Sequence, residues 1–189
     1  QELKRRMSLE GDLRQAIQQR ELVLDYHPQI SLKTGMLAGA AALLRWNHPK
    51  EGIIAPGDFI PLAEEMGLIA DIGRFTLRSA TRLIKESAKA DHSEFTVTIH
   101  VSVRQLTENF ARDCLEIIES EGVPAGRVAF EITESIPIDS ANEIAERIRP
   151  LREAGCSISL HDFAKGFFSL ANLRKLSVDG IKLDKAFID

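Results

Sequence analysis

Short apolar runs alternate with helical patterns in the second half of the chain, and three of these runs end in titratable residues. The runs cover residues 128–135, 157–163 and 180–184, and apolar positions at helical spacing separate each run from the next. β-Branched and aromatic residues favour strands, and the intervening helices favour parallel pairing. Because parallel strands end at one edge of a sheet, we expect their glutamate, histidine, aspartate and lysine side chains to share one face.

Residues 1–20 have the pattern of an amphipathic helix. Leu9, Leu13 and Ile17 recur at helical spacing between polar residues, and the basic run at residues 4–6 is interpreted as a solvated face. This predicts an entering or linker helix that continues from an upstream module, followed by one domain over residues 21–189. The chain starts at Gln1 without an initiator methionine, which we interpret as a fragment of a longer polypeptide.

The first two predicted strands are close together in the sequence. Residues 21–30 are rich in β-branched and aromatic side chains, and a Thr34-Gly35 turn separates them from a second apolar run over residues 37–46. So short a connection joins antiparallel strands, since a parallel crossover needs a dozen or more residues. The sequence therefore predicts a hairpin, with a first strand inverted relative to the later ones.

Helical patterns and turn residues define the remaining elements. A Pro56-Gly57 turn precedes Asp58, which we expect to cap a helix over residues 59–65. The other predicted elements are a helix over 75–89, a strand over 95–102, a helix through 106–117 and a helix that starts at Ser140 and is closed by Gly155. With the hairpin and the later runs this makes about six strands, typical of an α/β barrel or an open α/β sheet.

Period-two alternation assigns the strand residues to two faces of the sheet. Val97, Ile99 and Val101 form an apolar set in one strand. The opposite faces of the strands carry small polar or ionisable residues, namely Thr98, His100, Ser102, Glu131, Thr133, Ser135, Ser159, His161, Lys182 and Asp184. Such convergence at one end is what a barrel active site requires, whereas the alternative is a set of satisfied polar residues in the core.

Composition narrows the class of protein. A chain of 189 residues with 44% hydrophobic and 28% charged content can bury a full core, and its net charge of -4 argues against a general DNA or membrane binder. Cys114 and Cys156 have no paired spacing, so we expect a reduced protein in the cytoplasm. No apolar stretch approaches membrane-spanning length, so we expect no insertion of this segment into a membrane.

At this point the sequence resembles a known family. Five segments look like successive motifs of the EAL-domain family, in order and with similar spacing: residues 39–46, 102–106, 131–135, 162–166 and 178–184. The resemblance implies a TIM-like (β/α) barrel with an antiparallel first strand, of which this chain covers about six of the eight strands. It also implies two divalent cations, Mg²⁺ or Mn²⁺, and hydrolysis of one phosphodiester bond of cyclic di-GMP.

Carried over position by position, the family's motif residues are partly replaced. The glutamate that names the family is Ala41 here, the asparagine ligand on the third strand is His100, and the first aspartate of the paired Asp-Asp is His161. The retained positions are Glu131, Glu134, Asp162 and Lys182. In the family the lysine helps to hold the attacking water, so the resemblance assigns catalytic roles, here interpreted as vestigial, to Lys182, Glu131 and Glu134.

These replacements predict a degenerate member. Mg²⁺ prefers oxygen ligands in octahedral geometry, and a methyl group and two imidazoles do not supply them. We therefore expect no useful hydrolysis and no resident cofactor, with Mg²⁺ or Mn²⁺ needed only where the family activity survives. The predicted function is a noncatalytic signalling module for cyclic di-GMP, acting as a receptor or as a relay for an upstream domain in the same polypeptide.

The resemblance also suggests residues that touch the nucleotide. Gln29 and Arg45 correspond to family positions near guanine or phosphate, and the arginine fork suits phosphate oxygens. Leu43 and Asp162 complete the predicted ligand-binding set. The alternatives are a surface salt bridge for Arg45, a hydrogen bond at the barrel mouth for Gln29, and a core position for Leu43, as also for Phe59.

Two other functions stay open. One is a protein-interaction scaffold that no longer binds cyclic di-GMP. The other is a metal-dependent phosphodiesterase with a remodelled site, because His100, Glu131, His161 and Asp162 at adjacent strand ends would form a familiar zinc set. His27, His48 and His92 are interpreted as surface or loop residues. We also expect unpaired sheet edges, covered by a continuation of the polypeptide or by a second subunit such as a homodimer partner.

Overall fold

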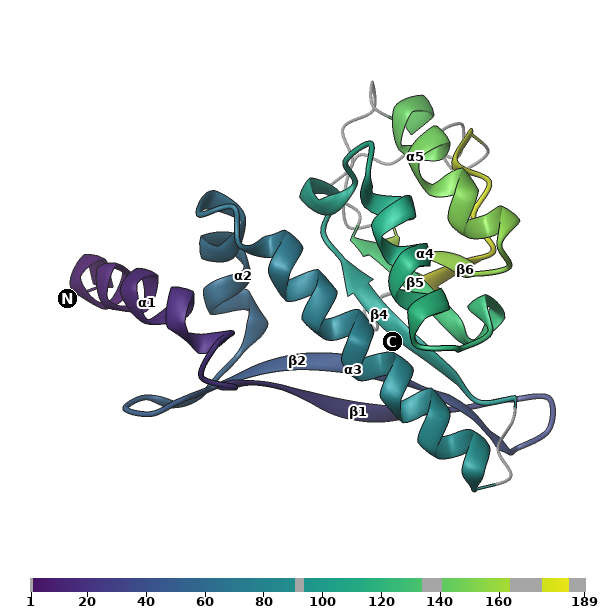
Figure 1. Cartoon of the computed structure of the whole chain (residues 1–189), viewed down its shortest axis with the longest axis horizontal. Helices are drawn as coiled ribbons and strands as arrows, with labels where there is room; N and C mark the ends of the chain where they lie inside the picture. Colours follow the sequence, from purple (N-terminus) through teal and green to yellow (C-terminus); the bar gives the residue numbers. More distant parts are fainter. Residues whose placement is uncertain (1, 91–93, 134–140, 164–174, 184–189) are drawn as a thin grey trace.

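The computed structural model describes residues 2–90, 94–133, 141–163 and 175–183. Within these residues the strands form a seven-stranded sheet with the order β1-β2-β4-β5-β6-β7 and with β3 paired to β2, and helices pack along one of its faces (Figure 1). The strands are β1 (Leu22–Ile30), β2 (Leu37–His48), β3 (Gly52–Ile54), β4 (Thr96–Val101), β5 (Val128–Thr133), β6 (Ser157–Phe163) and β7 (Gly180–Leu183). The α-helices are α1 (Glu2–Ala16), α2 (Pro56–Glu65), α3 (Ile69–Lys89), α4 (Phe110–Ser120) and α5 (Ala141–Glu153), and short 3₁₀ turns cover Val103–Gln105 and Ala125–Arg127.

The predicted hairpin is confirmed. β1 pairs antiparallel with β2, from Leu22 opposite Trp46 to Ile30 opposite Leu37, and Gly35 takes the positive φ of 68° that its turn requires. From β2 onward the pairs β2–β4, β4–β5, β5–β6 and β6–β7 are all parallel. The fold is therefore α/β with an inverted first strand, as the sequence predicts.

β2 and β4 approach each other closely at the start of their pairing. Gly39 lies opposite Thr96, and a Cβ at Gly39 would come within 2.3 Å of the Thr96 carbonyl oxygen. Only glycine fits this position without a shift of backbone, so the residue that opens the parallel part of the sheet is fixed by sterics.

Three local predictions are wrong. Asp58 does not cap α2, since the helix begins at Pro56 with Ala55 before it, and a proline suits the first helical turn because its missing N–H needs no partner there. The helix predicted to start at Phe75 starts at Ile69, shortly after the turn at Gly67. The helix predicted through 106–117 begins only at Phe110, because Leu106 closes the 3₁₀ turn over Val103–Gln105. In addition, the short strand β3, which pairs antiparallel with the end of β2, was not predicted.

Apolar side chains on the helix-facing side of the sheet form two clusters. The larger cluster joins β4, β5 and β6 to α3, α4 and α5, and the smaller joins β2 to α1, α2 and the start of α3. Buried positions of α3 recur every three or four residues, from Ile69 through Leu77 to Ile84. This spacing gives the helix one apolar stripe against the sheet, along which it runs diagonally (Figure 1).

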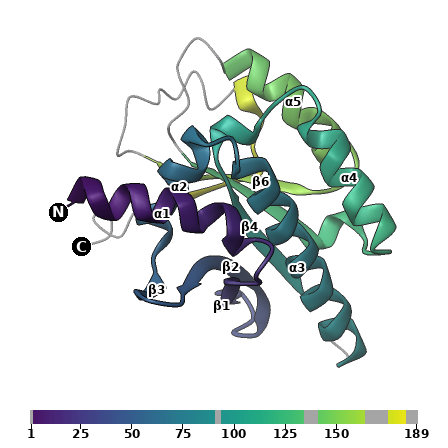
Figure 2. The same cartoon turned by 60° about the vertical axis from the view of Figure 1, so that its left-hand side comes forward.

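α1 packs onto the domain through its apolar stripe. Leu9 and Leu13 are buried in the smaller cluster, beside α2 (Figure 2). Arg5 and Arg6 of the basic run are exposed, in agreement with the predicted solvated face, and they form surface ion pairs with Glu51 and Glu65. The division of the chain at residue 20 stays a prediction.

Among the described residues, no helix combines the length and apolar character needed to cross a membrane.

His48 is not a surface residue, contrary to the prediction. It is 4% exposed, and its Nδ1 accepts hydrogen bonds from the backbone N–H groups of Lys50 and Glu51 at 3.2 and 3.1 Å. Its Nε2 lies 3.1 Å from Asp12 Oδ2 of α1, and its ring meets Trp46 edge-on. The side chain therefore ties α1 to the β2–β3 turn. His27 is exposed, as predicted, whereas His92 lies outside the described residues.

Candidate functional site

Three side chains converge on the face of the sheet opposite the larger helices. His100 of β4 is the register partner of Glu131 on β5, and His161 of β6 lies two residues beyond the partner of that glutamate. One donor atom from each of the three residues lies within 4.8 Å of the other two. The imidazole rings of His100 and His161 have centroids 5.1 Å apart. Parallel strands in register, each with period-two alternation, produce this arrangement.

Glu131 is the buried member of this group, with a side chain only 3% exposed. Its Oε1 lies 3.1 Å from Lys182 Nζ of β7 and 3.5 Å from His161 Nε2. A carboxylate removed from water needs such cationic or hydrogen-bonding neighbours, because desolvation of an isolated charge is costly. The four strands β4, β5, β6 and β7 thus supply one compact polar group.

The predicted nucleotide ligands on the hairpin lie on the same face of the sheet. Gln29 is half-buried, and its Oε1 accepts a hydrogen bond of 3.3 Å from the Thr98 hydroxyl. Arg45 donates to the Leu44 carbonyl oxygen, and its Nε lies 3.0 Å from Asp25 Oδ2. The salt bridge foreseen for Arg45 is therefore present. A contact of either residue with a nucleotide stays a prediction.

Two predicted residues cannot be placed fully. Glu134 lies outside the described residues, and for Asp162 the structure describes a place in β6 without its side chain. The loop positions between residues 164 and 174 are likewise outside the described part. Phe59 is fully buried against Trp46, with ring centroids 5.7 Å apart, so the core alternative is correct for it.

A cavity of about 440 Å³ lies beside the polar group. The middle of β2, the helix α2, the first turns of α3 and the end of β4 form its walls, with His100 and Leu43 among the lining residues. Most of the lining is apolar, with polar groups at Glu64, Ser102 and Thr133. Small-molecule sites commonly have volumes of roughly 300–1,000 Å³ with a few polar groups on apolar walls. This cavity matches that description.

Ser102 was expected on the inner face, but its partners at the polar rim of this cavity were not predicted. Ser102 donates a short hydrogen bond to Glu64 of α2, and Arg104 Nε lies 3.5 Å from the other oxygen of that glutamate. Gln105 is buried, accepts from the Ser102 backbone N–H and donates to the Ile69 carbonyl oxygen. Ser102, Arg104 and Gln105 fall in the motif-like segment 102–106, but only the tertiary fold, in which α2 lies across the cavity from the end of β4, brings the Glu64 carboxylate to Ser102.

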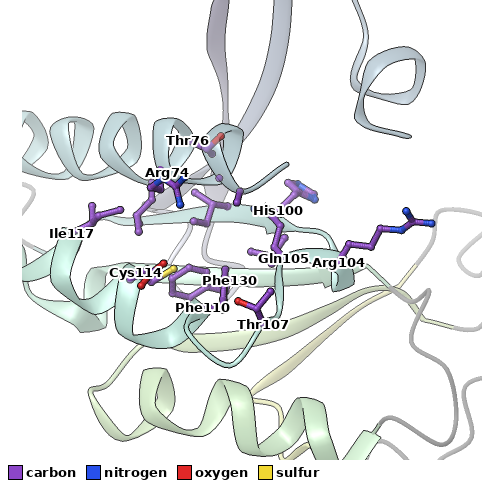
Figure 3. A pocket seen from close by; sticks show the side chains of 16 residues that line it. Arg74, Thr76, His100, Arg104, Gln105, Thr107, Phe110, Cys114, Ile117 and Phe130 are labelled. Carbon is purple, nitrogen blue, oxygen red and sulfur yellow. The ribbon is translucent and has the colours of Figure 1, made fainter. Parts of the chain in front are cut away.

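A second cavity of about 80 Å³ lies between α3, β4 and α4 (Figure 3). Phe110, Phe130 and Cys114 line one side of it, whereas the Arg104 side chain extends away. Burial raises the pKa of the Cys114 thiol to about 12. A neutral thiol among aromatic rings is a poor nucleophile, so Cys114 gives this space no reactive group. Most of the apolar lining residues belong to the larger apolar cluster, and His100 of the polar group is also among the lining residues.

Comparison with known proteins places this geometry in a family. The EAL domain family matches residues 10–189. The bifunctional diguanylate cyclase/cyclic di-GMP phosphodiesterase MucR of Pseudomonas aeruginosa is 34% identical over 184 residues, which are 97% of this chain and 27% of MucR. The oxygen sensor protein DosP of Escherichia coli is 36% identical over 188 residues, 99% of this chain and 24% of DosP. The chain thus spans about a quarter of the length of these curated relatives.

A solved structure supports the same placement. The PaMucR phosphodiesterase in a c-di-GMP complex superposes with a TM-score of 0.89 at 34% identity, covering 96% of this chain and 74% of that one. The likeness confirms the predicted TIM-like fold class with its inverted first strand. The order of strands, the inward polar group and the family match together show that the chain belongs to the EAL domain family.

Proposed function

We propose that this chain is a noncatalytic cyclic di-GMP signalling module, a nucleotide receptor or relay derived from an EAL phosphodiesterase. One observation carries the proposal: the donor group around Glu131 is made of two imidazoles and one carboxylate, where the family resemblance leads us to expect oxygen ligands. The activity, substrate and partners of the whole polypeptide are part of this proposal.

The donor group does not fit the Mg²⁺ or Mn²⁺ pair that the family implies. Mg²⁺ takes near-octahedral oxygen coordination with bonds of about 2.0–2.1 Å, and it is held poorly by nitrogen. Ala41, in the position of the glutamate, is 6% exposed and offers only a methyl group. Without the cations there is no activated water and no counter-charge for the phosphodiester, so the expected loss of rate spans orders of magnitude.

Nucleotide binding places different demands on the site. The 440 Å³ cavity offers apolar walls for a base, and the cations of Arg45 and Lys182 lie on the inner face for phosphate groups. Arg45 is engaged by Asp25, whose side chain is 57% exposed, so this pair can exchange for a phosphate at little cost. The PaMucR relative in its c-di-GMP complex shares this fold at a TM-score of 0.89.

Calorimetric titration with cyclic di-GMP in the presence of EDTA tests the receptor. We expect binding by the unmodified protein and weaker binding by Arg45→Ala, because phosphate loses its bidentate donor. Arg149→Ala is the matched control, since Arg149 is an exposed arginine of α5 that pairs with Glu146 and Glu153. If Arg45→Ala and Arg149→Ala bound cyclic di-GMP with equal affinity, Arg45 would not be a nucleotide ligand. No heat at any concentration would favour the interaction scaffold instead.

A hydrolysis assay with Mg²⁺ or Mn²⁺ tests the noncatalytic half of the proposal. We expect no linear dinucleotide from the unmodified protein. The triple replacement Ala41→Glu, His100→Asn and His161→Asp restores the family's donors and is expected to gain Mg²⁺ binding. Turnover by the unmodified protein at the rate of an active relative would overturn the proposal and favour the phosphodiesterase alternative.

A further inference from the structure

We infer that His100, Glu131 and His161 form a binding site for one transition-metal ion of the imidazole-preferring class, for which Zn²⁺ and Co²⁺ are suitable probes. The inference concerns a cation that differs from the oxygen-bound pair implied by the family. It does not depend on whether the cavity binds cyclic di-GMP, and it would hold equally for a scaffold.

The three side chains already converge closely enough for one ion. Their donor atoms lie within 4.8 Å of one another, and the His161 Nε2 to Glu131 Oε1 distance is 3.5 Å. A tetrahedral zinc ion with bonds of about 2.0–2.1 Å holds its ligand atoms about 3.4 Å apart. Small rotations of the two imidazoles close the remaining gap. Because each residue projects from a paired strand, the backbone positions are set by the sheet and not by a loop.

The donor types select the ion. Imidazole nitrogen is a borderline donor that suits Zn²⁺, Co²⁺, Ni²⁺ and Cu²⁺, whereas Mg²⁺ keeps oxygen ligands and its own waters. Two neutral imidazoles and one carboxylate leave a net charge of +1 with a divalent ion. That combination also satisfies Glu131, whose side chain is 3% exposed and otherwise depends on its cationic neighbours.

Lys182 acts as a competing cation at the same carboxylate. Its Nζ lies 3.1 Å from Glu131 Oε1, the oxygen that also faces His161. The Lys182 side chain is 49% exposed, so it can move into water when an ion enters. Metal binding is therefore an exchange of one cation for another. Removal of the lysine charge should strengthen metal binding, whereas loss of an imidazole should weaken it.

Metal titration of purified, EDTA-treated and desalted protein tests the site. We expect one equivalent of Co²⁺ to bind with the visible absorption of a low-coordinate nitrogen and oxygen site, and Zn²⁺ to displace it. Mg²⁺ at millimolar concentration should displace none. His161→Gln should weaken binding by at least the roughly 10- to 100-fold that loss of an outer-shell partner alone costs. Lys182→Gln should tighten it by about tenfold or more.

Matched variants separate the site from adventitious binding. His27→Gln removes an exposed histidine of β1, which is separated from β4 by β2, and should leave the titration unchanged. Circular dichroism of each variant checks that the fold is intact, and His100→Asn provides a second ligand variant. Equal Zn²⁺ affinity in the unmodified protein and in both ligand variants would overturn the inference, as would displacement of Co²⁺ by Mg²⁺. Cyclic di-GMP is absent throughout, so failure of the nucleotide proposal cannot affect the result.

Discussion

The two faces of the sheet differ in composition and in what they touch. On the helix-facing side, β4, β5 and β6 present apolar residues that are at most 3% exposed, namely Val97, Ile99, Val101, Val128, Phe130, Ile132, Ile158 and Leu160. On the inner side the same strands present threonine, serine, histidine and Glu131. One side is sealed by α3, α4 and α5, whereas the other holds the polar group. The 440 Å³ cavity is bordered by residues of both sides, with Leu43 and His100 from the inner side and Leu44 and Ile72 from the smaller apolar cluster.

Along the same strands, one set of alternate residues stabilises the fold and the other set carries the polar groups of the candidate site. Burial of apolar area drives folding, and it is concentrated on the helix-facing side. Replacement of donors on the inner side, as at Ala41, His100 and His161, leaves that area untouched. A family fold can therefore persist while its cation chemistry changes, and the two faces should respond differently to mutation.

The largest effect on stability is expected on the helix-facing side. Phe130 is 1% exposed and packs edge-on against Phe110, with ring centroids 6.1 Å apart. Phe130→Ala should lower the free energy of unfolding by about 3–5 kcal/mol, because it removes apolar contacts and leaves a cavity. Urea denaturation measures the change. Thr98→Ala on the inner side, which removes only the bond to Gln29, should cost about 1 kcal/mol or less. Equal losses of stability in Phe130→Ala and Thr98→Ala would contradict the expected difference between the two faces of the sheet.

Thiol reactivity gives a second contrast, between folded and unfolded chains. Burial raises the pKa of Cys114 from 9.0 to about 12, so at pH 8 its thiolate fraction should fall about a thousandfold. Alkylation followed by mass spectrometry should label this thiol only after unfolding in urea. The contribution of the buried, neutral Cys114 thiol to the free energy of unfolding is fully present below pH 9. It is lost as the pH rises towards 12, because the thiol then ionises more readily in the unfolded chain. Rapid labelling of Cys114 in the folded protein would contradict its placement in the sealed side.

An intermediate loss of stability is expected at Gly39, where β2 and β4 lie too close together for a side chain. Gly39→Ala places a methyl group against the Thr96 backbone oxygen and should cost about 1–3 kcal/mol. Gly11→Ala is the control, since its added Cβ meets nothing within 4 Å in α1 and should stabilise by about 0.5–1 kcal/mol. Thermal unfolding of the two variants should shift in opposite directions. A neutral Gly39→Ala would mean that the strands can separate there.

The smallest effect is expected on the outer surface of the helices. Arg112 of α4 is 64% exposed and pairs with Asp113 and Glu116. Arg112→Ala should lower the free energy of unfolding by about 0.3–0.5 kcal/mol, because water and salt screen such pairs. Denaturation at low and high salt should show the small difference shrinking with salt. A loss as large as that of Phe130→Ala would show that α4 depends on this surface.

Local patterns predicted the architecture well. Alternation in residues 95–102 correctly separated Val97 from His100, and the short Thr34-Gly35 connection correctly gave an antiparallel pair. Alternation puts His100 and Glu131 on the same face near the carboxyl ends of adjacent parallel strands, which is why their approach could be anticipated. Such features depend on periodicity within a few residues, and that information is local.

The failures have a different cause. β3 has only three residues, too few for alternation to be recognised. His48 is followed by Pro49 and resembles a loop residue, but its burial depends on Asp12 of α1, far away in the sequence. Glu64 meets Ser102 only because the fold places the carboxyl end of α2 near the end of β4. Each of these features arises from tertiary contacts between distant segments, which single-sequence patterns do not contain.

Glu64 and Glu65 are consecutive residues of α2, but they are held from opposite directions. Glu65 binds Arg6 of α1, whereas Glu64 binds Ser102 and Arg104 beside the end of β4. Neighbouring positions on a helix point about 100° apart, so the last turn of α2 contacts α1 through Glu65 and the residues after β4 through Glu64. One peptide link in α2 therefore joins the contact with α1 to the contact beside the 440 Å³ cavity, so the two contacts depend on the same short segment of backbone.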